Sequence, residues 1–164
     1  MPQHASVLRP PSRLPRRVAD SRSCARCLRA ALARRQPNAA LVLATSLGGG
    51  AAADHGGRAG PDVLGYAVIE WRSLAGSVAK LVVAEHARRK GIGEAVLRAS
   101  VEHLFGARRV MCINLHVDPA RQPAVALYAK LGWRVDGAVK DYYAPGRDAH
   151  RMVLDSEVYE AKRA

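Results

Sequence analysis

A basic, glycine-containing loop lies between an apolar segment and a helical pattern in the middle of the chain. The apolar segment ends in Leu81-Val82-Val83, and the loop reads Arg88-Arg89-Lys90-Gly91-Ile92-Gly93-Glu94. Glycine lets a ligand approach the backbone closely, and the free N–H groups that begin a helix favour negative charge. With three cations beside them, these groups predict a pyrophosphate site. The alternative is a glycine turn that only caps a helix, and the spacing matches neither a Rossmann nor a Walker loop.

Four side chains beyond this loop have the chemistry of acid–base catalysis or of substrate binding. His116 lies on the apolar run Val110–Val117, and an imidazole titrates near neutral pH, as a general base must. The alternative for His116 is a hydrogen-bonded core histidine. Tyr128 and the adjacent pair Tyr142-Tyr143 carry phenols, for which the alternative is hydrophobic packing.

A sheet and helices must bring these residues together, and the hydrophobic periodicity predicts both. Six segments predict strands: Asn38–Ser46, Val63–Trp71, Ser77–Ala84, Val110–Val117, Trp133–Val135 and Arg151–Leu154. Apolar residues at three- and four-residue steps predict helices at Gly93–Phe105 and around Ala124–Leu131. Gly48–Gly60 predicts a flexible hairpin loop. The order β-β-β-α-β-α-β-β predicts an α/β domain with one mixed sheet.

The length and composition exclude several classes of protein. A chain of 164 residues, 49% of them hydrophobic, is long enough for one domain with its own core. No apolar run approaches the roughly 20 residues that cross a bilayer, so we expect no membrane contact. Three cysteines are too few for a disulfide scaffold, which favours a reducing compartment. Cys24 and Cys27 have the spacing of half a zinc site, but no second pair follows, and we expect no bound metal.

The net charge of +12 is concentrated at the beginning of the chain. Residues 1–36 hold nine arginines and one acid, and they predict a poorly ordered basic arm with a helix over Ala25–Arg35. The arm is a mitochondrial transit peptide, a contact with nucleic acid or the ribosome, or an irregular lead-in. Unless it is a transit peptide, we expect a cytoplasmic protein. The predicted division is an arm at 1–36, the main domain at 37–158 and a tail at 159–164.

The strand, the basic glycine loop, the next helix and the segment AVALYAKLGW at Ala124–Trp133 together resemble the GNAT superfamily of acyl-CoA N-acetyltransferases. The resemblance extends over Leu41–Leu154. It implies a GNAT fold, with a single mixed, mostly antiparallel sheet whose splayed central strands hold acetyl-CoA. It also implies that Arg88–Glu94 grips the pyrophosphate and that the backbone of Leu81, Val82 and Val83 binds the pantetheine arm and stabilises the oxyanion. Tyr128 matches the tyrosine that protonates the leaving thiolate.

A narrower resemblance is to N-terminal protein acetyltransferases of the RimI and NatE catalytic-subunit type. It is carried by Leu115-His116-Val117 and by DYYAPGRDAH at Asp141–His150. It implies direct attack of a polypeptide α-amino group on the thioester, with His116 as base. Tyr142 and Tyr143 match a pair that clamps the first residues of the peptide. The implied partners are a polypeptide N-terminus and an auxiliary subunit or the ribosome.

Two positions depart from this narrower pattern. Ser77 stands where such relatives carry a second catalytic tyrosine. Arg121 stands where they carry an asparagine that touches the CoA arm, so Arg121 is a further candidate contact. The elements that wall the peptide groove are not recognisable in residues 1–40. Two other functions therefore stay open: acetylation of a small-molecule amine or lysine side chain, and binding of CoA or the ribosome without catalysis.

Overall fold

Seven strands form one sheet in the computed structural model, which describes residues 29–46 and 62–163. The strands are β1 (Arg29–Gln36), β2 (Ala39–Thr45), β3 (Val63–Arg72), β4 (Ala75–Val83), β5 (Cys112–Val117), β6 (Arg134–Ala144) and β7 (Arg147–Asp155). Their order across the sheet is β1-β2-β3-β4-β5-β7-β6. All neighbours run antiparallel except β4 and β5, which are parallel. The mixed, mostly antiparallel sheet that the sequence predicts is confirmed.

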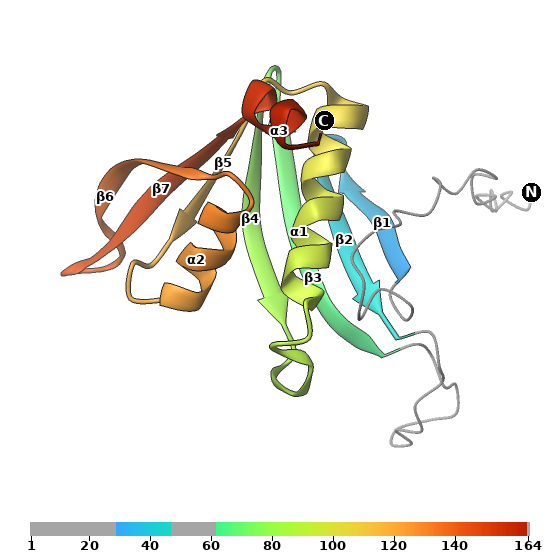
Figure 1. Cartoon of the computed structure of the whole chain (residues 1–164), viewed down its shortest axis with the longest axis horizontal. Coiled ribbons are helices and arrows are strands. Elements are labelled where there is room, and N and C mark those ends of the chain that lie inside the picture. Colours follow the sequence, from blue (N-terminus) through green and yellow to red (C-terminus); the bar gives the residue numbers. More distant parts are fainter. Residues whose placement is uncertain (1–28, 47–61, 164) are drawn as a thin grey trace, which may run out of the picture.

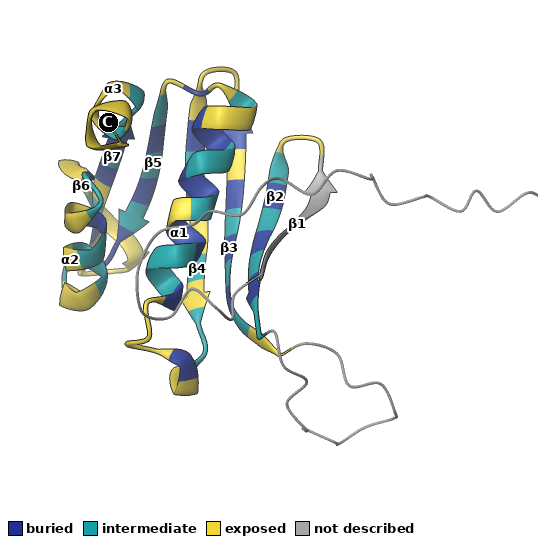
Figure 2. Ribbon diagram, turned by 45° about the vertical axis from the view of Figure 1, so that its right-hand side comes forward, coloured by how far each residue is buried: buried dark blue, intermediate teal, exposed yellow. Residues whose placement is uncertain are grey.

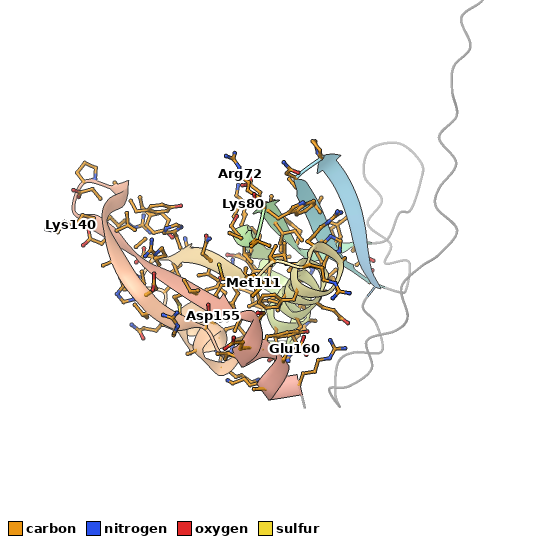
Figure 3. All side chains as sticks on the ribbon, turned by 90° about the horizontal axis from the view of Figure 1, so that it is seen from above. Arg72, Lys80, Met111, Lys140, Asp155 and Glu160 are labelled. Atoms are coloured by element: carbon orange, nitrogen blue, oxygen red, sulfur yellow. The ribbon has the colours of Figure 1, made fainter. Side chains whose placement is uncertain are left out.

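Three described helices lie on one face of this sheet, as Figures 1 and 3 show. They are α1 (Ile92–Glu102), α2 (Gln122–Lys130) and α3 (Ser156–Arg163), and α1 continues into a π-helical turn at His103–Ala107. α1 begins after Gly91, whose φ of 75° is a left-handed conformation that glycine adopts readily. Its buried residues, dark blue in Figure 2, recur at helical spacing and belong to the hydrophobic core that lies against the sheet. This stripe of α1 anchors the basic loop at one end of the core.

The central strands β4 and β5 pair over only three residues, Ala75–Ser77 with Cys112–Asn114. Beyond these pairs the two strands diverge, as the lower half of Figure 1 shows. β4 also carries one extra residue, Ala79, at a bulge opposite the junction of Val68 and Ile69 on β3. A bulge bends a strand and redirects its side chains. Because the bulge comes two residues after the last pair, β4 turns away from β5 at that point.

Alternation along β5 assigns its side chains to two faces of the sheet. Ile113, Leu115 and Val117 are buried in the core beneath the helices. Asn114 and His116 therefore point to the opposite face. No described helix covers that face, so its side chains line open cavities.

Two segments form elements that the sequence did not predict. Arg29–Gln36 forms a strand paired with β2, so the helix expected over Ala25–Arg35 is wrong for its described residues. The described part of the sheet thus begins within the segment that we assigned to the basic arm. Ser156–Arg163 forms α3, which crosses the predicted start of the tail at residue 159. β1 lies at the edge of the sheet, and α3 has no fully buried residue. Neither element therefore carries the strong apolar pattern from which it could be predicted.

The last two strands are much longer than predicted, because they extend into an exposed hairpin where few apolar residues mark them. The predicted loop Gly48–Gly60, the pair Cys24 and Cys27 and residues 1–28 lie outside the described residues. The proposed division of the chain therefore stays a prediction. Among the described helices, none has the length and apolarity to cross a membrane.

Gly76 lies where β4 passes close to the π-helical turn. An added Cβ there would lie 3.2 Å from both Cδ atoms of Leu104 and 3.4 Å from Cγ2 of Val110. We expect Gly76→Val to lower the free energy of unfolding by about 1–3 kcal/mol, because it overfills a packed region. Gly106→Ala is the control, since an added Cβ at Gly106 meets nothing within 4 Å. Denaturant unfolding measures both variants, and equal stability would show that this contact does not limit the packing.

Candidate active site

The diverging strands β4 and β5 expose backbone groups between them. Their ladder ends at Ser77 and Asn114, so the β4 edge from Val78 to Val83 that faces β5 has no strand partner among the described residues. Peptide groups on such an edge remain available to a ligand. The edge includes Leu81, Val82 and Val83, the predicted backbone contacts of the cofactor. It fits an extended ligand with amide groups, as the pantetheine arm of acetyl-CoA is.

The basic loop follows β4 directly and leads into α1. Arg89 and Gly91 have positive φ values of 61° and 75°, so the loop turns tightly into the helix. An added Cβ would meet nothing within 4 Å at Gly91 and would lie 3.4 Å from Val83 Cγ2 at Gly93. Arg89 and Lys90 are exposed and have no hydrogen bond or ion pair within the described part of the chain. These cations, beside the unpaired N–H groups of a helix start, fit a pyrophosphate.

Three members of the predicted loop use their side chains within the protein, and the first two are Arg88 and Ile92. Arg88 donates from Nε to the carbonyl oxygen of Val83 at 3.3 Å, and its Nη1 lies 3.3 Å from Glu85 Oε1. The hydrogen bond to Val83 and the ion pair with Glu85 hold the loop against the end of β4. The side chain of Ile92 is buried in the core. For Ile92, only the backbone N–H is available to a phosphate.

Glu94, the third such residue, joins α1 to α2. Its carboxylate accepts hydrogen bonds from Lys130 at 2.8 Å and from Arg98 at 2.9 Å. The hydrogen bond from Lys130 is the largest cause that lowers the pKa of Glu94, and Arg98 adds to it. The carboxylate is thus neutralised by two cations. Its backbone N–H, in the first turn of α1, remains for the cofactor.

Tyr128 lies on α2 and packs against Trp133, with ring centroids 6.0 Å apart. Burial raises the pKa of Tyr128, Tyr143 raises it further, and Arg121 opposes the rise. The phenol therefore keeps its proton at neutral pH, as a proton donor must, although the raised pKa makes it a weaker acid. Arg121 immediately precedes α2 and is exposed.

On the sheet face away from the helices, a cavity of about 290 Å³ opens where β4 and β5 separate. It is lined by residues of β3, β4, β5 and β6: Glu70, Ser77, Val78, Ala79, Asn114, Leu115, His116, Tyr142 and Tyr143. The structure thus brings His116 together with the predicted tyrosine pair. It does not bring Tyr128 or Arg121 into this lining. Ser77 has a short side chain, so the cavity extends into volume that a tyrosine would fill.

The imidazole of His116 stacks on the ring of Tyr142, with centroids 4.4 Å apart and planes 14° apart. Burial lowers the pKa of His116, and the positive charge of Arg151 lowers it further. The ring is therefore neutral at pH 7 and can accept a proton. Within the described residues it has no hydrogen-bond partner, so its nitrogen atoms are free for a substrate or water.

A chain of contacts fixes the two tyrosines over the cavity. Tyr143 lies edge-on to Tyr142 at 4.9 Å, and the guanidinium of Arg147 lies 5.3 Å from the centroid of the Tyr143 ring. Arg147 donates from Nε and Nη2 to one oxygen of Asp118, at 2.9 and 2.6 Å. The other oxygen of Asp118 accepts from the Ala120 N–H. These hydrogen bonds, that of Arg147 foremost, lower the pKa of Asp118. The buried carboxylate thus anchors the hairpin of β6 and β7, which carries Tyr142 and Tyr143 and is called the tyrosine hairpin below, to the end of β5.

Sequence reasoning missed four residues of this site: Glu70, Asn114, Asp118 and Arg147. Asn114 could be found from the alternation of β5, because it precedes His116 by two residues. Asp118 and Arg147 belong to separate segments, and no local pattern joins them. Glu70 follows an apolar run and has no distinctive neighbour in the sequence.

Residues 21–133 match the family described as the acetyltransferase (GNAT) family. The chain belongs to the GNAT family. An N-alpha-acetyltransferase of Sulfurisphaera tokodaii is 38% identical to this GNAT chain over 77 residues, which are 47% of the chain and 46% of the relative. The chain spans about half the length of the curated relatives it matches. The family resemblance read from the sequence is confirmed, and GNAT enzymes use acetyl-CoA, which agrees with the fit of the loop and strand edge.

Solved structures show the same fold. The spermidine/spermine N-acetyltransferase SpeG of Vibrio cholerae superposes with a TM-score of 0.66 at 15% identity, over 79% of this chain and 72% of that protein. The ribosomal-protein-S18-alanine N-acetyltransferase of Escherichia coli superposes with a TM-score of 0.61 at 21% identity, over 74% of this chain and 71% of that protein. At these identities the likeness establishes the GNAT fold.

The variants Gly91→Asp and Gly91→Asn test the assignment of the phosphate loop. They have the same shape, both side chains tolerate the left-handed conformation, and nothing crowds the added Cβ. The aspartate places a negative charge at the start of α1, so we expect CoA affinity to fall by at least about tenfold. The asparagine variant should stay within a few-fold of the wild type. Calorimetry with CoA measures both, with thermal unfolding as the folding control, and equal affinities would refute the assignment.

Arg147→Met tests the support of the tyrosine pair. The change keeps an aliphatic stem but removes the guanidinium between Asp118 and Tyr143. We expect KM for the acetyl acceptor to rise by about tenfold, the scale of lost charge-assisted hydrogen bonds, with CoA affinity unchanged. Arg163→Met on α3 is the control, because its partner Glu102 lies on the helical face. Steady-state kinetics distinguish the two, and an unchanged KM for the acceptor in Arg147→Met would show that the pair needs no such support.

Proposed function

We propose that this protein transfers the acetyl group of acetyl-CoA to the α-amino group of a polypeptide. The observation that carries the proposal is the position of His116. Its neutral imidazole stacks on Tyr142 at the cavity where β4 and β5 separate. A base, a substrate-sized cavity and the proposed path of the cofactor thus meet at one point of the sheet.

The proposed roles of the chain's own residues follow from their chemistry. Acetyl-CoA supplies an acetyl thioester that an amine can attack directly. An α-amino group has a pKa near 8, so it is mostly protonated at pH 7 and must lose a proton before it reacts. His116 accepts that proton, directly or through water. The free backbone edge of β4 offers N–H groups to the developing oxyanion, and Tyr128 donates a proton to the thiolate.

The choice of a peptide substrate rests on the tyrosine pair. Tyr142 and Tyr143 are 48% and 43% exposed although they line a cavity, so their rings and hydroxyls are available to a ligand. Exposed aromatic rings at a cavity mouth are typical of surfaces that bind other molecules. The name of the Sulfurisphaera relative, N-alpha-acetyltransferase, supports the same substrate. An auxiliary subunit or the ribosome as partner, and a cytoplasmic location, remain predictions.

A second candidate substrate is a small-molecule amine or a lysine side chain. The observation that favours it is the open sheet face, because α1, α2 and α3 all lie on the other side. Within the described residues, nothing narrows the cavity to a chain terminus.

An acetylation assay with a matched set of amines tests the proposal. The set contains short peptides with a free α-amine and no lysine, the same peptides with a formylated N-terminus and one lysine, and spermidine. We expect turnover of acetyl-CoA only with the free α-amines. Turnover confined to lysine or spermidine would contradict the α-amine substrate. Binding of CoA without turnover of any amine would contradict catalysis.

The pH dependence of turnover tests the role of His116. Because burial and Arg151 lower the pKa of His116, the imidazole stays neutral down to pH values below the usual histidine pKa of about 6.5. We expect the acid limb of the kcat profile below that value. His116→Gln should lower kcat by about a hundredfold near pH 7, with a smaller loss at pH 9, where the amine is already neutral. His86→Gln, in an exposed turn, is the control, and a His116→Gln profile identical to the wild type would exclude His116 as the base.

A further inference from the structure

A second, larger cavity continues from the one that contains His116. Its volume is about 410 Å³, and it lies on the same face of the sheet toward β2. The two cavities share three lining residues, Glu70, Ser77 and Asn114. A substrate that places its amine at His116 can therefore extend along the sheet into the second cavity.

Among the described residues that line the two cavities, Glu70 is the only carboxylate. It lies near the end of β3, where its cross-strand neighbours are Ala39 on β2 and Ser77 on β4. Both neighbours are small, so neither covers the carboxylate. Glu70 forms no ion pair or hydrogen bond with any side chain in the part of the chain that the structure describes. An acid that lines a cavity and is not ion-paired attracts a cation from outside the protein.

The register of the strands sets the distance from Glu70 to His116. Glu70, Ser77 and Asn114 are direct neighbours across β3, β4 and β5, and His116 is two residues beyond Asn114. Two strand spacings and a two-residue rise would place the Cα atoms of Glu70 and His116 about 12 Å apart in a regular sheet, and the divergence of β5 from β4 adds to this distance. A basic side chain on the first or second residue of an extended peptide holds its charge about 7–10 Å from the α-nitrogen. The two groups can thus bind one peptide at the same time.

We propose that Glu70 forms a subsite that selects substrates with a positively charged side chain at the first or second residue. This inference rests on the proposed function, because it assumes that the reactive amine is at His116. Glu70 acts as a specificity-determining residue and takes no part in proton transfer. The cation replaces the missing partner of the carboxylate, so a basic substrate gains an ion pair that a neutral substrate lacks.

Other charges on this face limit where the cation lies. Arg72, two residues beyond Glu70 on β3, also lines the larger cavity, and Arg72 and Lys80 both project on the side of the sheet away from the helices (Figure 3). Neither forms an ion pair with Glu70. Arg151, beside His116, is held by Asp136. The bound cation therefore lies on the side of Glu70 toward the first cavity, where it is farther from Arg72 and the repulsion by the arginine is weaker.

Kinetics with a matched peptide set test this subsite. The peptides carry lysine, methionine or glutamate at residue one or residue two and have no other charged side chain. For the wild type we expect kcat/KM to be about fivefold higher with lysine than with methionine, the scale of one accessible ion pair. The difference should vanish in Glu70→Gln. In Glu70→Lys, the glutamate peptides should become the better substrates.

Glu160→Gln is the matched control, because it makes the same change of net charge on α3, on the other side of the sheet (Figure 3). It should keep the wild-type preference for lysine. A wild-type protein that acetylates these peptides without preferring lysine, or that prefers lysine equally after Glu70→Gln, overturns the subsite but not the proposed function. If no peptide reacts while spermidine reacts with a Glu70-dependent KM, the α-amine function is wrong, and so is the peptide subsite.

Discussion

The arrangement of the candidate active site depends on the short pairing between β4 and β5. Their ladder ends after three residue pairs, because the bulge at Ala79 turns β4 away from its parallel neighbour. In a continuous sheet, the peptide groups between these strands would bind one another. Here the strands separate, and this opening leaves the peptide groups on the β4 edge for a ligand. The basic loop follows the end of β4, and the cavity with His116 lies on the sheet face away from the helices.

The rest of the fold holds the two sides of the opening apart and in place. On the helical face, Glu94 joins α1 to α2 through Lys130, so the helix that carries the basic loop is tied to the helix that carries Tyr128. On the other face, Asp118 holds Arg147 and thereby the tyrosine hairpin. In both links a carboxylate pairs with a cation from a distant segment of the chain. Each link thereby joins two elements that carry different parts of the site.

The sequence was sufficient to predict the position of the glycine loop, the strand that carries His116 and the order of the central elements, because each leaves a local signal. Gly91 and Gly93 mark a tight turn into a helix, and His116 interrupts an apolar strand. The strand β1 was mistaken for a helix because arginines and alanines dominate it and an edge strand needs no apolar alternation. The pair of Asp118 and Arg147, and the position of Glu70 beside the site, depend on strand register. Register is a property of the folded sheet, and no single segment encodes it.

The central claim is that one ligand passes through the opening between β4 and β5 and reaches His116. A crystal structure with a conjugate that joins the sulfur of CoA through an acetyl group to the α-nitrogen of a short peptide tests it most directly. We predict the pyrophosphate at the Gly91–Gly93 turn, the pantetheine arm along the free edge of β4, and the peptide beside Tyr142 and Tyr143. A conjugate whose peptide lies on the helical face of the sheet, or whose pantetheine arm does not run between the two strands, would contradict the account.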